Sequence, residues 1–307
     1  MATEWGYTDL MEWIEDGCDQ AVANNVTYLS CFEINLSTRS LPKEIERLVN
    51  LRNLCCISSK LTTIPKEIGK LKNLVVLNLS YNKLTDLPKE IGNLVNLESF
   101  ICSNNLLTFI PEEIGNLSNL DDLNMSNNSI IYVPKEIGNL KRLKSLELRK
   151  NKLTSLPKEI GNLKLLESLH IQENELTRLP KEIGDLPKLH TLLCSENKLT
   201  ELPEEFTNLH DMNWLSLSSN QFKSIPPEVF KLTELSYLGL AKNNISEMPT
   251  DIKNLVNLQL IGIADNPMYD FPDELTSLPN LRRICCRGII LRSKYIKANP
   301  NIEWQQM

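Results

Sequence analysis

The sequence lacks long hydrophobic runs and an excess of positive charge. No stretch approaches the ~20 apolar residues that a transmembrane helix requires. The first segment has no basic start, and it carries Glu12, Glu15 and Asp16, which do not suit a secretory signal. With 39 acidic against 33 basic residues the net charge is -6, so nucleic acid is not an expected partner. These absences predict a cytoplasmic protein without a membrane span.

The sequence also lacks the residue groupings that carry chemistry. It has three histidines and no Gly-rich phosphate loop, and its cysteines are not clustered in pairs at the two ends. No spacing predicts a metal site. Cys285, beside three arginines, is the one cysteine in the electropositive setting that a nucleophile needs. Because no set of catalytic or metal-binding residues accompanies this cysteine, we expect neither an enzyme nor a cofactor.

What the chain does have is a period of 23 residues. Prolines recur at this spacing without an insertion at positions 42, 65, 88, 111, 134, 157, 180, 203, 226, 249 and 272. Within one unit, Leu77 and Leu79 alternate with Val76 and Asn78, which predicts a short strand with one buried face. One unit has too little apolar surface to fold alone, so successive coils are expected to stack around a shared core with their strands in parallel.

An asparagine recurs in nine successive units, at the point where the chain turns away from the predicted strand. Its buried amide is expected to satisfy backbone groups that the following turn leaves unpaired, and so to link adjacent coils. The nine members of this structural ladder are Asn82, Asn105, Asn128, Asn151, Asn174, Asn197, Asn220, Asn243 and Asn266. The proline-led segments that follow predict a convex side of extended or 3₁₀ turns. Four cysteines, Cys56, Cys102, Cys194 and Cys286, replace core leucines and are expected to be reduced and buried.

The ends depart from the period, which predicts residues 1–27 as an N-terminal cap, 28–280 as about eleven repeats, and 281–307 as the last strand and a C-terminal cap. Asp9 and Glu12 resemble an N-cap pair that opens a short helix with Leu10, Trp13 and Ile14 on its apolar side. The C-terminal cap is expected to use Ile289, Ile290, Leu291, Tyr295, Ile296 and Trp304. Alternatively, either end docks a partner.

The unit Leu87-Pro88-x-x-Ile91-x-x-Leu94, with the leucines and the asparagine before it, resembles the leucine-rich repeat. The 23-residue type is similar to that of the cytosolic Ras-suppressor and plant intracellular Ras-group proteins, and to repeats of bacteria and giant viruses. The resemblance implies an α/β repeat fold, a right-handed horseshoe solenoid with a concave parallel sheet and convex 3₁₀ or loop segments. It implies a protein-binding scaffold in signalling, with a small GTPase or another signalling protein as partner. Two alternatives are the recognition part of a ubiquitin-ligase or pathogen effector system, and a self-assembling solenoid.

Two columns of variable residues flank the strand leucines and are expected to face a partner. Trp214, Tyr237 and Leu260 follow one another in the first column, beside Ser216, Gly239 and Gly262 in the second. Aromatic side chains beside small ones predict a binding ridge with a groove, or else a stack that only stiffens the sheet. The predicted partner-binding residues are Trp214, Tyr237, Leu260, Leu193, His170, His190, Glu147 and Asp122.

Charge adds a second hint about the partner. In the middle of the predicted concave face, acids outnumber bases and would steer a basic partner, or they are ordinary solvated charge. The acids are Glu98, Asp121, Asp122, Glu147, Glu167, Glu173 and Glu196, and the bases are Lys144, Arg149 and Lys150. Toward the C-terminal end, Arg282, Arg283 and Arg287 reverse the sign.

Overall fold

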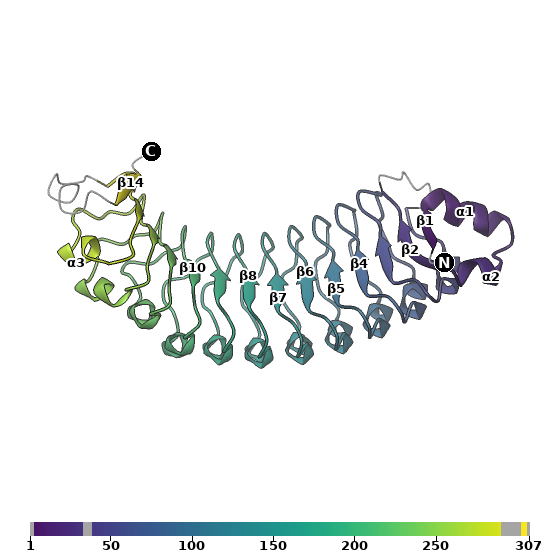
Figure 1. The fold of residues 1–307 in the computed structure, drawn as a ribbon, viewed down its shortest axis with the longest axis horizontal. Coiled ribbons are helices and arrows are strands. Elements are labelled where there is room, and N and C mark those ends of the chain that lie inside the picture. The colour runs from purple at the N-terminus through teal and green to yellow at the C-terminus, as the bar shows by residue number, and fades with distance from the viewer. Residues whose placement is uncertain (1–2, 33–38, 290–301, 306–307) are drawn as a thin grey trace. The chain divides into compact units, whose positions relative to one another are not determined.

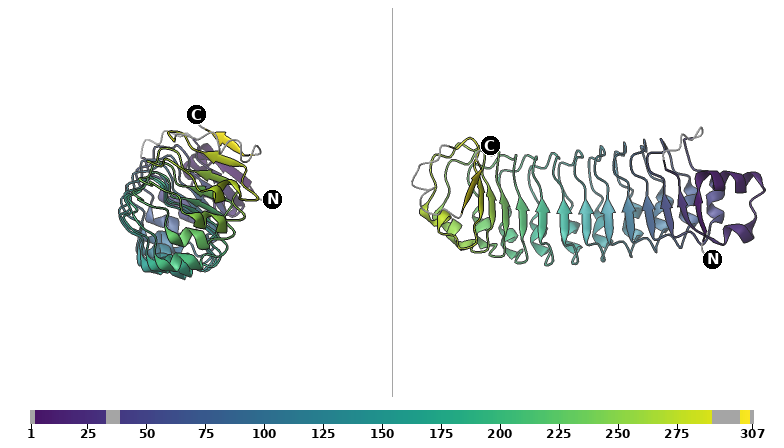
Figure 2. Two further views of the ribbon diagram at one scale, coloured as in Figure 1. Left: turned by 90° about the vertical axis from the view of Figure 1, so that its left-hand side faces the viewer. Right: turned by 45° about the horizontal axis from the view of Figure 1, so that its top comes forward.

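The structure, a computed structural model, describes residues 3–32, 39–289 and 302–305. It divides the chain into two units, residues 1–153 and 154–307. In each unit, short parallel strands line one side and 3₁₀ helices the other, as Figure 1 shows and the views of Figure 2 repeat. The predicted solenoid of leucine-rich coils, with 3₁₀ segments opposite its strands, is thus confirmed within each unit.

Among the described residues, the first unit holds seven strands in the order β1 to β7, all parallel to their neighbours. Two α-helices lie near β1 at its N-terminal end (Figure 1). The elements are β1 (Thr3–Gly6), α1 (Tyr7–Glu15), α2 (Gln20–Ala23), β2 (Val26–Ser30), η1 (Lys43–Arg47), β3 (Asn53–Cys55), η2 (Lys66–Lys70), β4 (Val76–Asn78), η3 (Lys89–Asn93), β5 (Ser99–Ile101), η4 (Glu112–Asn116), β6 (Asp122–Asn124), η5 (Lys135–Asn139) and β7 (Ser145–Glu147).

The second unit repeats this plan from β8 to β14, again with parallel pairing. Its last repeat has a short α-helix in place of a 3₁₀ helix. The elements are η6 (Lys158–Asn162), β8 (Ser168–His170), η7 (Lys181–Asp185), β9 (Thr191–Leu193), η8 (Glu204–Asn208), β10 (Trp214–Ser216), η9 (Pro227–Lys231), β11 (Tyr237–Gly239), η10 (Thr250–Asn254), β12 (Leu260–Gly262), α3 (Asp273–Thr276), β13 (Arg283–Cys285) and β14 (Glu303–Gln305).

The strands pair in the register that the period predicts. Val76 lies opposite Ser99 on the next strand, one period along the chain. The central residue of most strands is a leucine such as Leu77, which is fully buried, while the residues on either side of Leu77 remain partly exposed. The first coil differs, because Tyr28 pairs with Asn53, a longer step than in the other coils. The departure from the 23-residue period at the N-terminal end is thus confirmed.

The asparagine ladder forms hydrogen bonds in both directions. The Oδ1 atom of Asn220 accepts the backbone N–H of Leu199 at 2.9 Å, in the preceding coil. Its Nδ2 atom donates to the carbonyls of Cys194 and Leu217, each at 3.0 Å. Asn82, Asn105, Asn128, Asn151, Asn197, Asn243 and Asn266 repeat this pattern. The ladder is therefore structural, as its position predicts.

The predicted core cysteines are buried free thiols. Burial raises the pKa of the Cys102 and Cys194 thiols well above the ordinary value. A proton stays on each sulfur at neutral pH, so these residues act as small hydrophobic side chains in the core.

Both ends differ from the prediction in detail. Helix α1 buries Leu10 and Trp13, but Asp9 is not its N-cap. Gly6 takes that position, and Asp9 accepts the N–H of Gly6 at 2.6 Å from inside the first turn. The strand β1, which precedes this helix, was not expected.

At the C-terminal end, β14 pairs with β13 and brings Trp304 beside Phe271, with ring centroids 6.0 Å apart. Ile289 is buried, as the cap requires. The other predicted cap residues, Ile290, Leu291, Tyr295 and Ile296, lie outside the described residues.

Candidate functional site

The solvent-facing side of the strands, here called the sheet face, carries the predicted aromatic ridge on three adjacent strands. Trp214, Tyr237 and Leu260 are direct neighbours on β10, β11 and β12. The Trp214 and Tyr237 rings stack, with centroids 4.1 Å apart and an angle of 14° between their planes. Trp214 remains 44% exposed, so the stack leaves almost half of this residue free for a further contact.

The small residues beside the ridge do not form an open groove along its whole length. The Tyr237 hydroxyl bends over Gly239 and lies 3.0 Å from where a Cβ atom on that glycine would be. Burial raises the pKa of Tyr237, and a hydrogen bond with Ser216 partly opposes that rise. The space above Gly239 is thus filled by the hydroxyls of Ser216, Tyr237 and Ser218, whereas the space above Gly262 is open.

The other predicted binding residues spread over both units. Leu193 lies in the second column on β9, and His170 occupies the same column on β8. His190 immediately precedes β9 and therefore lies outside the strand and outside both columns. Its exposed ring is 4.0 Å from Glu167. In the first unit, Asp122 accepts the hydroxyl of Ser99 at 3.2 Å.

Also in the first unit, Glu147 accepts the amide of Asn124 at 2.7 Å. Asp121 forms ion pairs with Arg142 at 3.2 Å and with Lys144 at 3.0 Å. Burial raises the pKa of Asp121, but hydrogen bonds from Lys144 and Arg142 outweigh burial and lower it overall. These contacts use part of the predicted acidic surface to join neighbouring coils.

The described residues offer little for catalysis. No cluster of three or more His, Cys, Asp or Glu side chains within them could hold a metal ion. Burial raises the pKa of the Cys285 thiol, against the lowering effect of Arg283. A nucleophilic cysteine needs the opposite shift, so the structure does not support Cys285 in that role.

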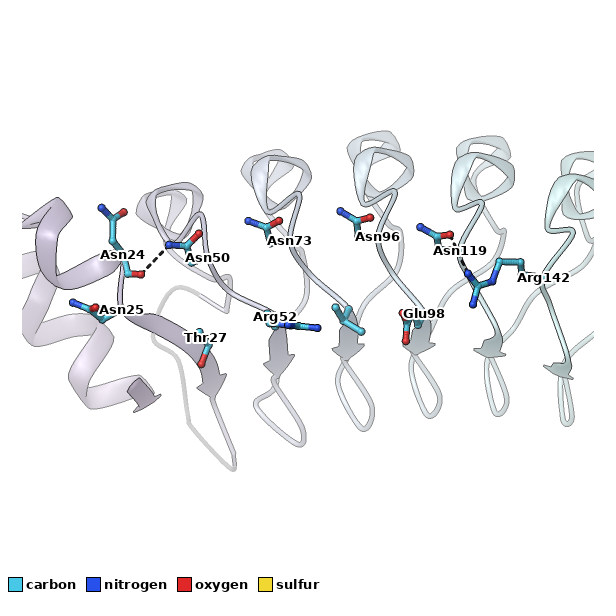
Figure 3. Close-up of a pocket in the computed structure, with 11 residues that line it drawn as sticks. Asn24, Asn25, Thr27, Asn50, Arg52, Asn73, Asn96, Glu98, Asn119 and Arg142 are labelled. Atoms are coloured by element: carbon cyan, nitrogen blue, oxygen red, sulfur yellow. Dashed lines mark hydrogen bonds between the residues drawn. The ribbon is translucent and has the colours of Figure 1, made fainter. Parts of the chain in front are cut away.

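A polar groove in the first unit was missed at the sequence level. It has a volume of about 690 Å³ and lies where the 3₁₀ segments lead into the strands. Figure 3 shows Asn50, Asn73, Asn96 and Asn119 in one line along it. Each of these amides donates to a backbone carbonyl of the preceding coil at 2.9 Å. This outer asparagine row could have been found from its 23-residue spacing.

The groove also carries charge of both signs. Arg52 and Glu98 line it near the strand starts, and Arg142 closes one end, where its guanidinium lies 3.4 Å from the Asn119 Oδ1 atom (Figure 3). Amide and charged side chains of this kind can form hydrogen bonds with a polar ligand. The four amides, however, already donate to the preceding coil, and these contacts between coils are enough to explain their presence.

An exposed apolar cluster in the first unit was missed as well. Leu106 and Ile131 are each more than half exposed, and Phe109 and Tyr132 are also exposed. The corresponding positions of other repeats carry polar residues such as Lys83. The cluster is a second candidate contact surface.

Comparison with known proteins defines the class of this chain. A model of the leucine-rich repeat region matches residues 26–146 and 130–235, and a second leucine-rich repeat model matches residues 212–268. The chain belongs to the leucine-rich repeat family, whose members generally act as protein-interaction modules. No curated protein matches the sequence. Membership in the Ras-suppressor group stays a prediction.

Several solved structures of leucine-rich repeat proteins are similar to this chain. A leucine-rich repeat protein of Leptospira interrogans is 34% identical with a TM-score of 0.85, over 99% of this chain and 82% of that one. An internalin of Listeria monocytogenes shares the fold at 22% identity, with a TM-score of 0.80 over 94% of this chain and 82% of its own. The plant peptide hormone receptor RGFR1, in complex with RGF2, is 26% identical with a TM-score of 0.55, and the match covers 91% of this chain and 58% of that one.

Within the described residues, no helix has the length and apolar content needed to cross a membrane.

Proposed function

We propose that this protein is a non-enzymatic scaffold that binds a protein partner on the sheet face of its second unit. The exposed stack of Trp214 on Tyr237 carries the proposal. Folding does not require a large aromatic ring on the solvent-exposed face of a sheet. Partly exposed Trp and Tyr side chains beside small residues are typical of interface hot spots. The plant receptor in complex with RGF2 supports peptide or protein recognition on this fold.

Free cysteines support a reducing, cytoplasmic location as part of the proposal. All eight are free thiols, and four of them, Cys56, Cys102, Cys194 and Cys286, fill core positions that suit a reduced cysteine. More specifically, we propose that the partner is a signalling protein such as a small GTPase, which the resemblance to the Ras-group proteins implies.

The test is partner binding by the double variant Trp214→Ala, Tyr237→Ala. We expect the variant to lose partner affinity by about 2 kcal/mol or more, because it removes both hot-spot rings. Stability should fall by only about 0.5–1.5 kcal/mol, the typical value of one aromatic pair. Affinity capture from a lysate followed by titration of the captured partner measures the first quantity, and thermal melting measures the second.

The control is Phe109→Ala, Tyr132→Ala, which removes two exposed aromatic residues from the first unit. If the sheet-face variant melts at a lower temperature but binds as tightly as the unaltered chain, the stack only stiffens the sheet. If the control variant alone loses the partner, binding lies on the apolar cluster of the first unit.

A further inference from the structure

The sheet face of the second unit contains a recess that no side chain of the described residues fills. Gly239 and Gly262 are paired on β11 and β12 and form its floor. A Cβ atom built on Gly262 would meet one neighbouring heavy atom within 4 Å, the Gly239 Cα at 3.9 Å. Gly262 itself is buried, so its backbone forms the floor of the recess and is not part of its walls.

The walls of this recess are mainly apolar. Tyr237 bounds it on the β11 side, where its hydroxyl already covers Gly239. Cys285 pairs with Gly262 in register and bounds it on the β13 side. Because β11 and β13 are the two neighbours of β12, Tyr237 and Cys285 stand on opposite sides of the strand that carries Gly262. Leu260, two residues before Gly262, closes a third side.

The rim of the recess is positive, although the whole chain is acidic. Two arginines of the rim are already paired, Arg283 with Glu303 at 2.8 Å and Arg287 with Asp265 at 2.7 Å. Arg282 is exposed and forms no ion pair within the part of the chain that the structure describes. Strands β11 to β14 and the residues close to their ends include four cations, Arg282, Arg283, Arg287 and Lys242, and two carboxylates, Asp265 and Glu303.

We propose that this recess receives one aliphatic side chain from an acidic segment of the partner protein, and that a carboxylate of the same segment pairs with Arg282. The proposal rests on the proposed function and names the chemistry of its partner. A recess that is open above one residue only and has apolar walls suits Leu, Ile, Val or Met and not a large aromatic ring. The Arg282 guanidinium and the positive rim favour a carboxylate beside that side chain.

Gly262 offers a sharp test because a side chain can be added there without an obvious clash. Leucine already stands in the same column at Leu193 on β9, and Gly262 does not have the positive φ that would strain a side chain. We expect Gly262→Leu to fill the recess and preserve the fold. Arg282→Glu reverses the charge of the arginine that forms no ion pair within the described residues, at an exposed position. Lys253→Glu makes the same charge change on η10, on the opposite side of the coil, and is the matched control.

The probe is a random peptide library displayed on phage and selected on the unaltered chain. Enriched peptides should carry Asp or Glu within a few residues of an aliphatic residue. Synthetic copies should bind Gly262→Leu and Arg282→Glu about tenfold more weakly or worse, which corresponds to about 1.4 kcal/mol, and should bind Lys253→Glu normally. Melting curves and circular dichroism verify that the variants are folded.

Three outcomes overturn the proposal. The first is that no peptide is enriched, and the second is that the enriched peptides lack the acidic and aliphatic pair. The third is that the selected peptides need Trp214 but tolerate both Gly262→Leu and Arg282→Glu. The third outcome rejects the recess while leaving the sheet face as a protein-binding surface, so the two proposals fail separately.

Discussion

At the scale of single residues, each coil has a backbone position whose conformation does not suit its side chain. The residue just before each ladder asparagine has a φ of about 50–57°, in the left-handed region that favours glycine. This conformation aims its N–H at the next coil, as when Ser219 donates to the Ala241 carbonyl at 2.7 Å. The nine residues concerned are Tyr81, Asn104, Asn127, Lys150, Glu173, Glu196, Ser219, Lys242 and Asp265.

Glycine at one of these positions should stabilise the protein. A left-handed conformation costs a residue with a side chain about 1–2 kcal/mol, and the greater freedom of glycine in the unfolded chain offsets roughly 0.5–1 kcal/mol of that. We expect Ser219→Gly to raise the free energy of unfolding by about 0.5 kcal/mol in urea titrations. Its neighbour Ser218 does not have a positive φ, so Ser218→Gly should be destabilising. Equal effects of the two changes would contradict this account.

The ladder asparagine next in the chain should respond in the opposite direction. Asn220→Ala leaves the Leu199 N–H without its buried acceptor and the Cys194 carbonyl with the Asn197 amide alone, so stability should fall by about 1–3 kcal/mol. Asn220→Asp keeps an oxygen that can accept the Leu199 N–H but loses the amide N–H donors. Comparison of the two variants therefore separates the contribution of the acceptor from that of the donors. Gln221→Ala, at the exposed neighbour, is the control for chemical denaturation. An unchanged midpoint for Asn220→Ala would show that water replaces the amide.

At the scale of elements, the spacing of the 3₁₀ helices in the first unit depends on glycine. A Cβ atom on Gly92 in η3 would lie 2.4 Å from the Glu113 carbonyl oxygen in η4, closer than any real contact. Gly92→Ala should therefore force the two helices apart and lower the free energy of unfolding by about 1–3 kcal/mol, as overpacking does. Lys253 holds the same repeat position in η10 but is exposed, so Lys253→Ala should be nearly neutral. Similar stabilities for the two variants would show that the helices move apart without cost.

Most elements could be predicted because the period fixes them. The strand register, the asparagine ladder and the 3₁₀ segments each follow from one column of residues that is repeated every 23 positions. Strands β1 and β14 could not be predicted in this way, because they lie outside the period. The left-handed positions gave no signal either, since the residues there range from Tyr81 to Asp265 and share no chemistry.

The candidate site was only partly accessible from the sequence. The 23-residue spacing predicted that Trp214 lies beside Tyr237, and the pairing of β10 with β11 confirms it. The recess above Gly262 depends on the direction in which the Tyr237 side chain turns, which no column specifies. The sequence alone suggested equal grooves at Gly239 and Gly262, whereas the structure leaves open space at Gly262 only.

At the scale of the whole molecule, each coil contacts mainly its neighbours, so a defect should weaken the chain locally. The N-terminal cap allows this to be tested. Trp13 is buried, its ring centroid lies 5.6 Å from that of Trp5, and its indole N–H donates to the Asp19 carbonyl at 2.9 Å. The cap thus covers the first coil with one well-packed aromatic pair.

Trp13→Ala should remove about 3–5 kcal/mol from the stability of this end, the usual cost of deleting a buried aromatic side chain. Amide hydrogen exchange should then become faster in β2 and β3 while β10, β11 and β12 keep their protection, because exchange reports the local opening free energy. Val22→Ala, an exposed residue of α2 in the same cap, should leave both regions unchanged. Faster exchange of similar size in β2 and β11 of the Trp13 variant would instead mean that the chain unfolds as one cooperative body, and the nearest-neighbour description would not apply.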